Sequence, residues 1–518
     1  MAKKVVIDEN NYYDSVTLMS ISKDIKGMEG MTEAVVVMAT PHNKELLENV
    51  GLLTEEADNA SPKDMVVAIE ADTDELAEEA LNSVTEALEA KASAGGDEDY
   101  RPRTLDSALD AMPGANLAIV SVPGDYAKKE AEKALNKGLH VMLFSDNVPV
   151  EEEIELKELA AEKGLLLMGP DCGTAVINNK PLAFSNVVSE GNIGLVAASG
   201  TGAQEVSTII DKSGLGVSQV IGTGGRDLST EVGGREMLKG LKALAADDST
   251  EVIVLVSKPP ADEVVKKILA EVDEIDKPVV VNFLGGNEDL FADTKAIYSS
   301  NLEEAALKAV ALSEGEEYEA KEFTIPEEEV AKIVEEETAK YSDAQKYLRG
   351  LYTGGTLCDE SMLILADELD ALYSNIPLKP EWVLEDNTKS QENTALDLGE
   401  DEFTQGRPHP MIEPFTRVER VEVEAEDEEM AILLADVVLG YGSHENPAGE
   451  LAEAIKEAKE KAEARGGHLT TIVSVCGTAN DPQDLEEQTA KLEEVGAIVM
   501  PSNAQAARLA AKIVQEIN

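Results

Sequence analysis

Sulfur and imidazole side chains are scarce in this chain. Its 518 residues include three cysteines and five histidines. Cys172, Cys358 and Cys476 lie far apart, and none belongs to a CxxC pair. The sequence therefore predicts neither a disulfide framework nor a metal site. Reduced thiols are typical of the cytoplasm, where we expect the protein to be.

Long apolar runs are also lacking. No segment approaches the roughly 18 uninterrupted apolar residues of a membrane helix. The N-terminal MAKKVVIDENNYYDS has no extended apolar core of the kind found in a secretory signal. We expect a soluble, untargeted protein with no membrane partner.

Basic residues are heavily outnumbered by acidic ones. The 44 lysines and arginines stand against 103 aspartates and glutamates, which gives a formal net charge of -59. Such a charge repels nucleic acid and anionic lipid at long range, so neither is an expected partner. The excess of acid is by itself typical of a surface adapted to a salty cytoplasm. A small anionic substrate would have to be held by local N–H groups and a few cations.

The length predicts about three or four domains. Residues 1–95 mix strand-like and helix-like segments, which indicates a small α+β domain, and SAGGDEDYRPR (93–103) has the composition of a linker. Beyond it, continuous apolar strands alternate with amphipathic helices, a pattern typical of parallel sheets covered on both faces. We predict a multidomain α/β protein with further domains at 104–188, 189–315 and 345–518.

The last predicted domain repeats the order of the one before it. In the third domain GNIGLVAASGTGAQ is followed by GVSQVIGTGGRDLS, TEVIVLVSKPP and KPVVVNFLGGN, and in the fourth YLRGLYTGGTLCDE is followed by TALDLGEDEFTQGRPHP, MAILLADVVLGYGSHENP and LTTIVSVCGTAND. Two copies of one α/β unit are predicted, with ligands at the carboxyl ends of the strands. The acidic stretch between them, 314–337, is predicted to be mostly a solvated helix.

A candidate anion site follows the first strand of the third domain. LVAASGTGAQE (195–205) ends an apolar run at small residues and continues into a predicted helix. Such a turn leaves unpaired N–H groups at a helix start, where the dipole also favours negative charge. Ser199, Gly200 and Thr201 are therefore predicted to hold a phosphate or a carboxylate. Later loops supply further candidates for the cleft, which are Gly224, Gly225, Gly285, Gly286 and Asn287; the last three could equally form a plain turn.

Several ordered motifs resemble a known family. SVP (121–123), GPDC (169–172), GNIGLVAASGT (191–201), GLGVSQVIGTGG (214–225) and KPVVVNFLGG (277–286) are similar to the alpha subunit of succinyl-CoA synthetase and to NDP-forming acyl-CoA synthetases. YTGGTLCDE and the closing domain resemble the carboxy-terminal domain of the beta subunit of those enzymes. With GPDCGTA, RPHPMI and the distinct N-terminal domain, the combination resembles the FdrA proteins over nearly the whole chain.

The resemblance implies a fold and a pair of binding turns. It implies a truncated Rossmann-like domain of the CoA-binding type at 104–188, followed by two flavodoxin-like domains of the succinyl-CoA-synthetase type. In the synthetases, two helices aim their N-termini at opposite ends of the path of a phosphohistidine. The resemblance places one of these turns at Ser199, Gly200 and Thr201, and the other at Thr353, Gly354, Gly355 and Thr356.

Parts of the synthetase machinery are missing from the sequence. The phosphohistidine would follow the FLGG strand, but the chain reads GGNEDLFADTKAIYSSN there, and no histidine occurs between His140 and His409. The glycine-rich opening of a CoA-binding domain would precede RTLDSALD, where AKASAGGDEDY stands instead. An ATP-grasp domain and a GxxxxGK[ST] loop are also lacking. CoA is therefore left open as a cofactor, and no other cofactor is predicted.

The FdrA resemblance implies a subunit of the catabolic oxamate carbamoyltransferase of allantoin degradation. That enzyme converts oxalurate and phosphate into oxamate and carbamoyl phosphate. Phosphate or carbamoyl phosphate would then be a substrate, other subunits of the complex would be partners, and a homo-oligomer is compatible with the sequence. Attack of phosphate on a ureido carbonyl creates an oxyanion that preorganised N–H donors stabilise. One binding turn could hold phosphate and the other the oxalurate carboxylate.

Cations and a general acid are expected in the same loops. Arg226, Lys258 and Arg407 lie at predicted strand ends, where each could neutralise an oxyanion or pair with one of the many carboxylates. A departing amide needs a proton. His409 is the first candidate for that acid, ahead of His444.

Three questions stay open at this point. Cys172 and Cys358 could be reactive thiols, although packing as small buried residues is the favoured interpretation. The chain could be an NDP-forming acyl-CoA synthetase that takes its nucleotide domain and its histidine from a partner. It could also be a non-catalytic subunit whose binding turns sense a phosphorylated metabolite.

Overall fold

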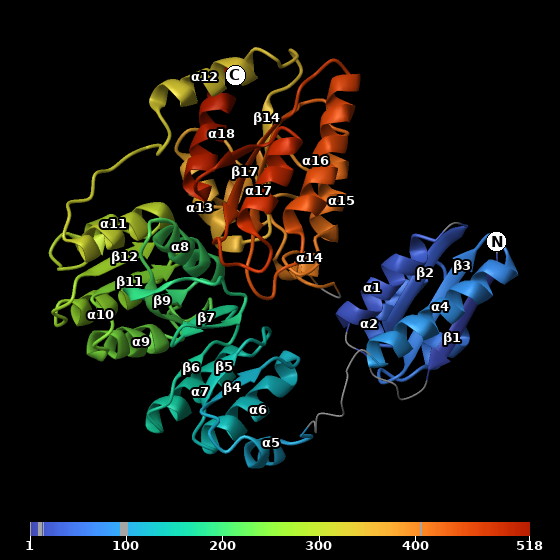
Figure 1. Ribbon diagram of the computed structural model, residues 1–518, viewed down its shortest axis with the longest axis horizontal. Coiled ribbons are helices and arrows are strands. Elements are labelled where there is room, and N and C mark those ends of the chain that lie inside the picture. The colour runs from blue at the N-terminus through green and yellow to red at the C-terminus, as the bar shows by residue number, and fades with distance from the viewer. Residues whose placement is uncertain are drawn as a thin grey trace. The chain divides into compact units, whose positions relative to one another are not determined.

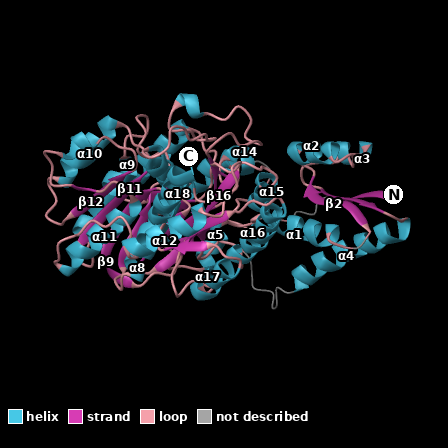
Figure 2. Cartoon of the chain, turned by 90° about the horizontal axis from the view of Figure 1, so that it is seen from above, coloured by secondary structure: helices cyan, strands magenta, loops and turns pink. Residues whose placement is uncertain are grey.

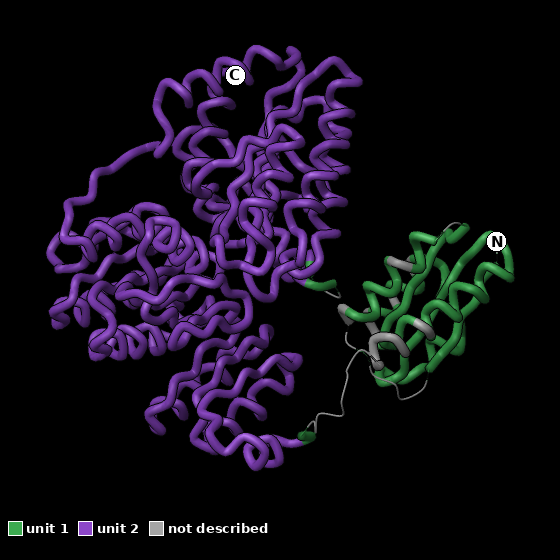
Figure 3. Tube along the Cα trace, in the orientation of Figure 1, with its two compact units in different colours: residues 1–103, 404–408 green, residues 104–403, 409–518 purple. Residues whose placement is uncertain are grey.

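The computed structural model describes residues 2–8, 13, 15–28, 30–93, 102–404 and 407–517. They form two compact units, which Figure 3 shows in different colours. Unit 1 comprises residues 1–103 and 404–408, and unit 2 comprises residues 104–403 and 409–518. Most of the predicted linker at 93–103 lies outside the described residues.

Unit 1 is built around a three-stranded antiparallel sheet in the order β1-β3-β2. Its elements are β1 (Ala2–Asp8), α1 (Ser15–Lys26), β2 (Met31–Met38), α2 (Pro41–Asn49), α3 (Glu55–Asn59), β3 (Met65–Ala71) and α4 (Asp74–Ser93). Apolar residues of α1 and α4 pack on one face of the sheet, and those of α2 and α3 pack on the other (Figure 2). The small N-terminal domain of the prediction is confirmed.

Unit 2 begins with a short parallel sheet, β4-β5-β6. Its elements are α5 (Leu105–Ala111), β4 (Leu117–Val120), α6 (Gly124–Asn136), β5 (His140–Leu143), α7 (Val150–Glu162) and β6 (Leu167–Met168). The alternation of strand and helix is that of a Rossmann-like sheet with few strands.

The middle of unit 2 forms a seven-stranded sheet, in the order β13-β12-β11-β9-β10-β7-β8. The strands are β7 (Thr174–Ile177), β8 (Lys180–Ala183), β9 (Glu190–Ala198), β10 (Val217–Gly222), β11 (Val252–Ser257), β12 (Val279–Phe283) and β13 (Ile297–Tyr298). The helices are α8 (Gly200–Lys212), α9 (Arg235–Ala246), α10 (Asp262–Val272), the 3-10 turn η1 (Glu288–Phe291) and α11 (Leu302–Glu314). The pairs β8–β7 and β7–β10 are antiparallel. The pairs β10–β9, β9–β11, β11–β12 and β12–β13 are parallel.

The C-terminal part of unit 2 forms a five-stranded parallel sheet, β15-β14-β16-β17-β18. The strands are β14 (Tyr347–Tyr352), β15 (Thr394–Asp397), β16 (Met430–Val438), β17 (Thr470–Cys476) and β18 (Ile498–Met500). The helices are α12 (Glu327–Thr338), α13 (Gly355–Ala366), η2 (Pro380–Trp382), α14 (Asp401–Thr404), α15 (Phe415–Glu424), α16 (Pro447–Ala464), α17 (Leu485–Glu494) and α18 (Asn503–Ile517).

The two larger sheets repeat one strand order. The series β10-β9-β11-β12-β13 in the first corresponds to β15-β14-β16-β17-β18 in the second. Helices α8 and α11 of the first half pack with α13 and α18 of the second in one shared core (Figure 1). The predicted α/β fold class is confirmed, and the repeat is visible in the topology.

The acidic stretch at 314–337 is less helical than predicted. Helix α12 begins only after Pro326. Proline is tolerated at a helix start but disrupts a helix interior. The helix is also only partly solvated, because Val330 is buried in the shared core. The abundance of glutamate gave a helical signal, but the proline set where the helix begins.

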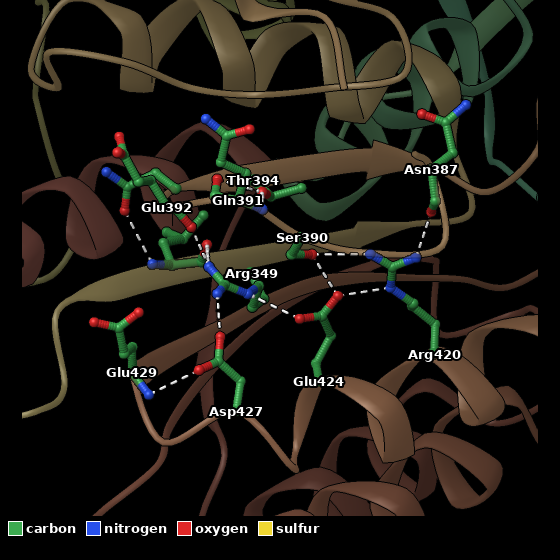
Figure 4. Close-up of polar contacts among 12 residues, drawn as sticks. Arg349, Asn387, Ser390, Gln391, Glu392, Thr394, Arg420, Glu424, Asp427 and Glu429 are labelled. Carbon is green, nitrogen blue, oxygen red and sulfur yellow. Dashed lines mark hydrogen bonds and ion pairs between the residues drawn. The ribbon is translucent and has the colours of Figure 1, made fainter. Parts of the chain in front are cut away.

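A buried ionic network joins helix α15 to strand β14 of the C-terminal sheet. Glu424 lies between two guanidinium groups, with Arg349 Nε donating to one carboxylate oxygen at 2.8 Å and Arg420 Nε to the other at 2.6 Å (Figure 4). Asp427 and Ser390 add contacts on either side. A buried carboxylate with two arginine partners is fully paired, so we assign this network to structure rather than to chemistry.

Candidate functional site

The predicted strand-to-helix turns meet within unit 2. Ser199 is the N-cap residue of α8, and its Oγ accepts a hydrogen bond from Gly202 N at 3.1 Å. The same Oγ lies 2.7 Å from Oγ1 of Thr356 in the first turn of α13. A Cβ on residue 202 would lie 2.3 Å from Ser199 Oγ, so glycine is required for this cap. The two turns share one crevice.

A cleft of about 570 Å³ opens over this contact. Its lining comes from the carboxyl ends of β4, β5, β9, β11, β14 and β15, as expected for ligand sites of parallel sheets. The ionisable lining residues are Asp146, Asp171, Lys258, Asp397 and His409. With three carboxyl groups and one lysine, the cleft has little cationic character to offer a highly charged ligand.

The first turn of α8 carries N–H groups that its helix cannot use. Gly200 and Thr201 occupy the first two helical positions, so no helical carbonyl lies four residues before either. Among the described residues, neither N–H makes a hydrogen bond outside regular helix and sheet pairing. Both residues line the cleft. This turn is therefore available to an oxyanion.

The turn of α13 is occupied by a carboxylate of the protein. Asp436, in β16, accepts hydrogen bonds from Thr353 N at 2.8 Å and from Gly354 N at 2.7 Å. Arg417 Nη1 lies 3.2 Å from the same carboxylate. The sequence predicts a substrate anion at Thr353 and Gly354, but their N–H groups bind Asp436 instead. Only the later part of this turn, Gly355 and Thr356, remains for a ligand.

Asp397, the last residue of β15, approaches the start of α13 from the cleft. A Cβ on Gly355 would lie 2.2 Å from Asp397 Oδ2, so glycine permits the close approach. Burial raises the pKa of Asp397 to about 7, against the opposing effect of Lys258. Both protonation states are therefore populated near neutral pH, which suits a group that accepts and returns a proton.

Asp171 is the second buried carboxyl group of the cleft. Its backbone lies in the left-handed region, with φ 54°. Burial raises the pKa of Asp171 to about 6, and the negative charge of Asp146 acts in the same direction. Two carboxyl groups with raised pKa values in one cleft mark a candidate site of proton transfer.

Lys258 is the ammonium group in the cleft lining. Its Nζ lies 3.1 Å from Oδ2 of Asp359. Burial disfavours the charged form, but Asp359 and Asp397 raise the pKa of Lys258 above its ordinary value. The lysine is therefore charged and already balanced by carboxylates.

His409 lines the cleft in a form that differs from the prediction. Its Nδ1 accepts a hydrogen bond from Met411 N at 3.2 Å, so the ring proton belongs on Nε2. Burial lowers the pKa of His409 to about 4. The sequence predicts a general acid here, but a neutral imidazole at pH 7 is a hydrogen-bond donor and a poor proton source. Asp397 and Asp171, with pKa values closer to 7, are better suited to donate a proton at neutral pH.

The predicted arginines do not line the cleft described here. Arg226 donates to Val148 O at 2.6 Å and pairs with Glu153 at 3.0 Å. Arg407 is exposed and belongs to the segment 404–408 of unit 1. The interpretation of Arg226 as a structural ion pair is thus the one that its contacts support.

The predicted loop glycines divide into two groups. Gly225 lines the cleft, and its neighbour Gly224 packs on the backbone, where a Cβ would lie 2.1 Å from Pro170 O. Gly285, Gly286 and Asn287 are not among the lining residues. They form a turn in which Asn287 Oδ1 caps the 3-10 helix η1. The plain-turn alternative describes these three.

The cysteines and His444 have structural surroundings. Cys172 and Cys358 are buried, and burial raises the pKa of Cys172 to about 12 and that of Cys358 well above its ordinary value. The packing interpretation fits both thiols. His444 Nδ1 accepts from Asn446 N at 3.2 Å, and the residue is not part of the lining.

Sequence reasoning missed Asp397, Asp436 and Gln204. The first two are single carboxylates inside or at the end of apolar strands, in TALDLG and LLADVVLG. A charge at such a position needs a buried partner or a raised pKa, and this was the available signal. Gln204 gave no comparable signal, because an amide in an amphipathic helix is common on a solvated face.

Comparison with known families agrees with this architecture. Residues 1–102 match the family described as AllF, heavy metal-associated domain; residues 188–285 match the CoA binding domain; and residues 351–513 match the CoA-ligase family. These matches define the class: an AllF-type N-terminal domain followed by domains of the succinyl-CoA-synthetase type.

The relatives extend this classification to the whole chain. The chain is 45% identical to the uncharacterized protein YahF of Escherichia coli strain K12 over 514 residues, which cover 99% of each chain. It therefore belongs to the FdrA family of succinyl-CoA-synthetase-like proteins. It is also 28% identical to the alpha subunit 2 of the ADP-forming succinate–CoA ligase of Archaeoglobus fulgidus, over 36% of this chain and 65% of that protein.

Solved structures give weaker likeness. The ATP citrate lyase of Methanothrix soehngenii, in complex with citrate and coenzyme A, aligns over 80% of this chain and 84% of that chain at 13% identity, with a TM-score of 0.36.

The residues of unit 1 do not fit the heavy metal that its family description names. Thiophilic metals are held by cysteine thiolates, and all three cysteines of the chain lie at or beyond residue 172. Among the described residues, no group of three or more His, Cys, Asp or Glu side chains could hold a metal ion. No step is derived through a metal.

The cleft also does not fit the diphosphate of CoA. Its single lysine is balanced by carboxylates. At the start of α6, a Cβ on Gly124 would lie 2.4 Å from Asn147 O, so that close approach is already taken by the protein backbone. The glycine-rich opening looked for before residue 104 falls mostly outside the described residues. No step is derived through CoA.

No helix among the described residues is long and apolar enough to cross a membrane.

Proposed function

We propose that this chain is a subunit of a catabolic carbamoyltransferase that uses oxalurate and phosphate to form oxamate and carbamoyl phosphate. The single observation that carries the proposal is the unoccupied N–H pair of Gly200 and Thr201 in a cleft with few cations. Such a site suits one small oxyanion. It does not suit a nucleotide or a long phosphorylated cofactor.

The loop after β12 adds a second argument. In the synthetases that this chain resembles, a phosphohistidine carries phosphate between two sites. Here residues 284–301 after β12 contain no histidine, and His409 has its proton on the nitrogen that would have to attack phosphorus. Free phosphate as a substrate removes the need for a covalent carrier.

The proposed reaction balances without a cofactor. An oxygen of hydrogen phosphate forms a bond to the ureido carbon of oxalurate, and the bond from that carbon to the inner nitrogen breaks. The electron pair of the broken bond stays on the nitrogen. The proton of hydrogen phosphate ends on the same nitrogen, which becomes the amide of oxamate.

Five residues of the cleft have roles in this step. The N–H groups of Gly200 and Thr201 hold phosphate, and Nε2–H of His409 donates to the oxyanion that develops on the ureido carbonyl. Asp397 accepts the proton of phosphate and returns it to the departing nitrogen. Lys258 keeps the negative charges around Asp397 in balance.

The test is formation of carbamoyl phosphate from oxalurate and phosphate by the purified chain, with and without the proteins encoded beside it. His409→Gln should lower turnover by roughly 10²- to 10³-fold, the loss typical of one oxyanion donor. His444→Gln is the matched control, since it removes a loop histidine outside the cleft lining, and it should leave turnover unchanged. Absence of carbamoyl phosphate in every combination would refute the proposal.

A second candidate rests on the match of residues 351–513 to the CoA-ligase family. An NDP-forming acyl-CoA synthetase that borrows its nucleotide domain would pass through a phosphorylated histidine. Incubation with labelled ATP and partner proteins should then give an acid-labile phosphoprotein. Without such a species the second candidate is excluded.

A further inference from the structure

Gln204 lines the cleft and carries a buried hydrogen-bond acceptor that has no partner among the described residues. It lies one helical turn after Gly200 on α8, the residue is 1% exposed, and it lines the cleft. Among the described residues, no donor lies within hydrogen-bond distance of its Oε1. A buried acceptor without a partner costs roughly 1 to 3 kcal/mol, so it is normally paired.

The orientation of this amide follows from its neighbour. Nδ2 of Asn186 donates to Leu439 O at 3.0 Å and to Asp481 Oδ2 at 2.7 Å, which fixes Asn186 Oδ1 as an acceptor. Gln204 Nε2 donates to that Oδ1 at 3.0 Å. Exchanging the two ends of the Gln204 amide would place two oxygens against each other. Oε1 is therefore the atom left over.

The acceptor belongs with the oxyanion site. Side chains of an α-helix lean toward its N-terminus and cover the residue four positions earlier. For Gln204 that residue is Gly200, which has no side chain to separate the amide from the N–H groups of the first turn. One helical turn thus offers two donors for an anion and, beside them, one acceptor for an N–H group.

We infer that Gln204 Oε1 accepts a hydrogen bond from an amide N–H of the ligand whose oxyanion is bound at Gly200 and Thr201. The ligand class is a small phosphate or carboxylate that also carries a carbamoyl, ureido or primary amide group. This inference rests on the proposed function and makes it more specific, because a simple acyl phosphate has the anion but lacks the N–H group. Gln204 is then the residue that makes the site selective for carbamoyl over acyl substrates.

The experiment compares two stable ligands that differ in one group. Phosphonoacetamide carries an amide NH₂ where 2-oxopropylphosphonate carries a methyl group of similar size. Wild-type protein should bind phosphonoacetamide roughly tenfold or more tightly in calorimetry, as expected for one hydrogen bond to a buried acceptor. Gln204→Met should abolish most of this preference by weakening phosphonoacetamide, with little change for 2-oxopropylphosphonate.

Gln219→Met is the matched control. Gln219 forms a similar pair with an asparagine, since its Nε2 donates to Asn178 Oδ1 at 3.0 Å and its Oε1 accepts from Asn178 N at 2.8 Å. Both ends of its amide are paired and it is not part of the cleft lining, so the ligand preference should survive. Equal binding of the two ligands by wild type, no binding of either, or an unchanged preference in Gln204→Met would each overturn the inference.

The outcome is separable from that of the proposed reaction. A preference for phosphonoacetamide without carbamoyl phosphate formation would refute the transfer reaction and support the assignment of Gln204. Carbamoyl phosphate formation without the preference would do the opposite. The wild-type comparison needs no variant, so a poorly folding Gln204→Met would still leave the inference testable.

Discussion

The start of α8 and the start of α13 are equivalent places in a repeated fold, yet a carboxylate of the protein fills part of the α13 turn and leaves the α8 turn open. Strand pairing sets Ser257 of β11 beside Ala198, the residue before Ser199. Continuing the pairing in the second half sets Asp436 of β16 beside Tyr352 at the matching position. Ser257 leaves the N–H groups of Gly200 and Thr201 unoccupied, whereas Asp436 binds those of Thr353 and Gly354, directly before α13.

This difference shows how a duplicated scaffold acquires two roles. A carboxylate at a helix N-terminus is stabilised by the dipole and the N–H groups, but it excludes a substrate anion from the same place. In the second half the burial of Asp436 is matched by Arg417. We interpret the α8 turn as the element that binds the anion, and the α13 turn as a structural element against which Asp397 is positioned.

The largest expected effect comes from breaking the α13 side. Asp436→Asn leaves the buried guanidinium of Arg417 without a counter-ion, which should lower the free energy of unfolding by about 3 to 5 kcal/mol. Urea denaturation measures this loss. The double variant Asp436→Asn with Arg417→Met should recover most of it, and a loss below about 1 kcal/mol in the single variant would contradict the ionic role.

The next effect comes from making the α8 side resemble the α13 side. Ser257→Asp should place a carboxylate at the N–H groups of Ser199 and Gly200, the positions that match Thr353 and Gly354, and phosphate affinity should fall roughly hundredfold, which corresponds to about 2.7 kcal/mol. Calorimetry with inorganic phosphate measures the change. Ser257→Ala, which adds no charge, should bind phosphate as the wild type does; if Ser257→Asp did so as well, the α8 turn would not be the anion site.

A smaller effect on anion affinity is expected from pH, because titratable carboxyl groups lie in the same cleft as the α8 turn. The pKa values of Asp171 and Asp397 are raised to about 6 and about 7, so both are mainly neutral at pH 5 and mainly charged at pH 8. Each new negative charge repels a bound anion. Sulfate stays a dianion over this range, and its affinity should fall about tenfold as pH rises.

Asp397→Asn sharpens this pH experiment. The variant should lose the decrease centred near pH 7 and keep the one near pH 6, because only Asp171 would still titrate. A pH profile identical to that of the wild type would show that Asp397 does not face the bound anion.

The smallest effect is expected from changes at the buried thiols of Cys172 and Cys358. Burial raises the pKa of both Cys172 and Cys358, so neither should react with iodoacetamide in the native protein at pH 8. Cys358→Ala should reduce stability by about 1 kcal/mol and leave turnover unchanged. Rapid labelling of either native thiol, detected by mass spectrometry, would revive the reactive-cysteine alternative.

Much of the fold could be predicted because its signals are local. Apolar strands such as VIVLVS (252–257) and MAILLADVV (430–438) are recognisable by composition, and the order of strand, glycine turn and helix revealed the repeat. The helix predicted over 314–337 was too long, because the glutamates favour a helix over the whole stretch, whereas the observed helix begins only after Pro326. The domain boundaries at 95, 104, 188, 315 and 345 stay predictions beyond the separation of unit 1 from unit 2.

The candidate site was predictable only in part. Ser199, Gly200 and Thr201 were found because a helix start after a buried strand has a sequence signature. The choice between an anion contact and an ion pair for Arg226 stayed open, since its partner Glu153 lies 73 positions earlier in the chain and no local pattern links the two.

The sequence by itself determined the order of strands and helices, the family and the two glycine turns that lead into α8 and α13, because these depend on neighbouring residues and on periodic burial. Only the tertiary structure decided which of the two turns is partly filled by a carboxylate of the protein. That choice depends on a single side chain brought from another strand, Ser257 or Asp436, and on the burial that sets the protonation of the carboxyl groups around it.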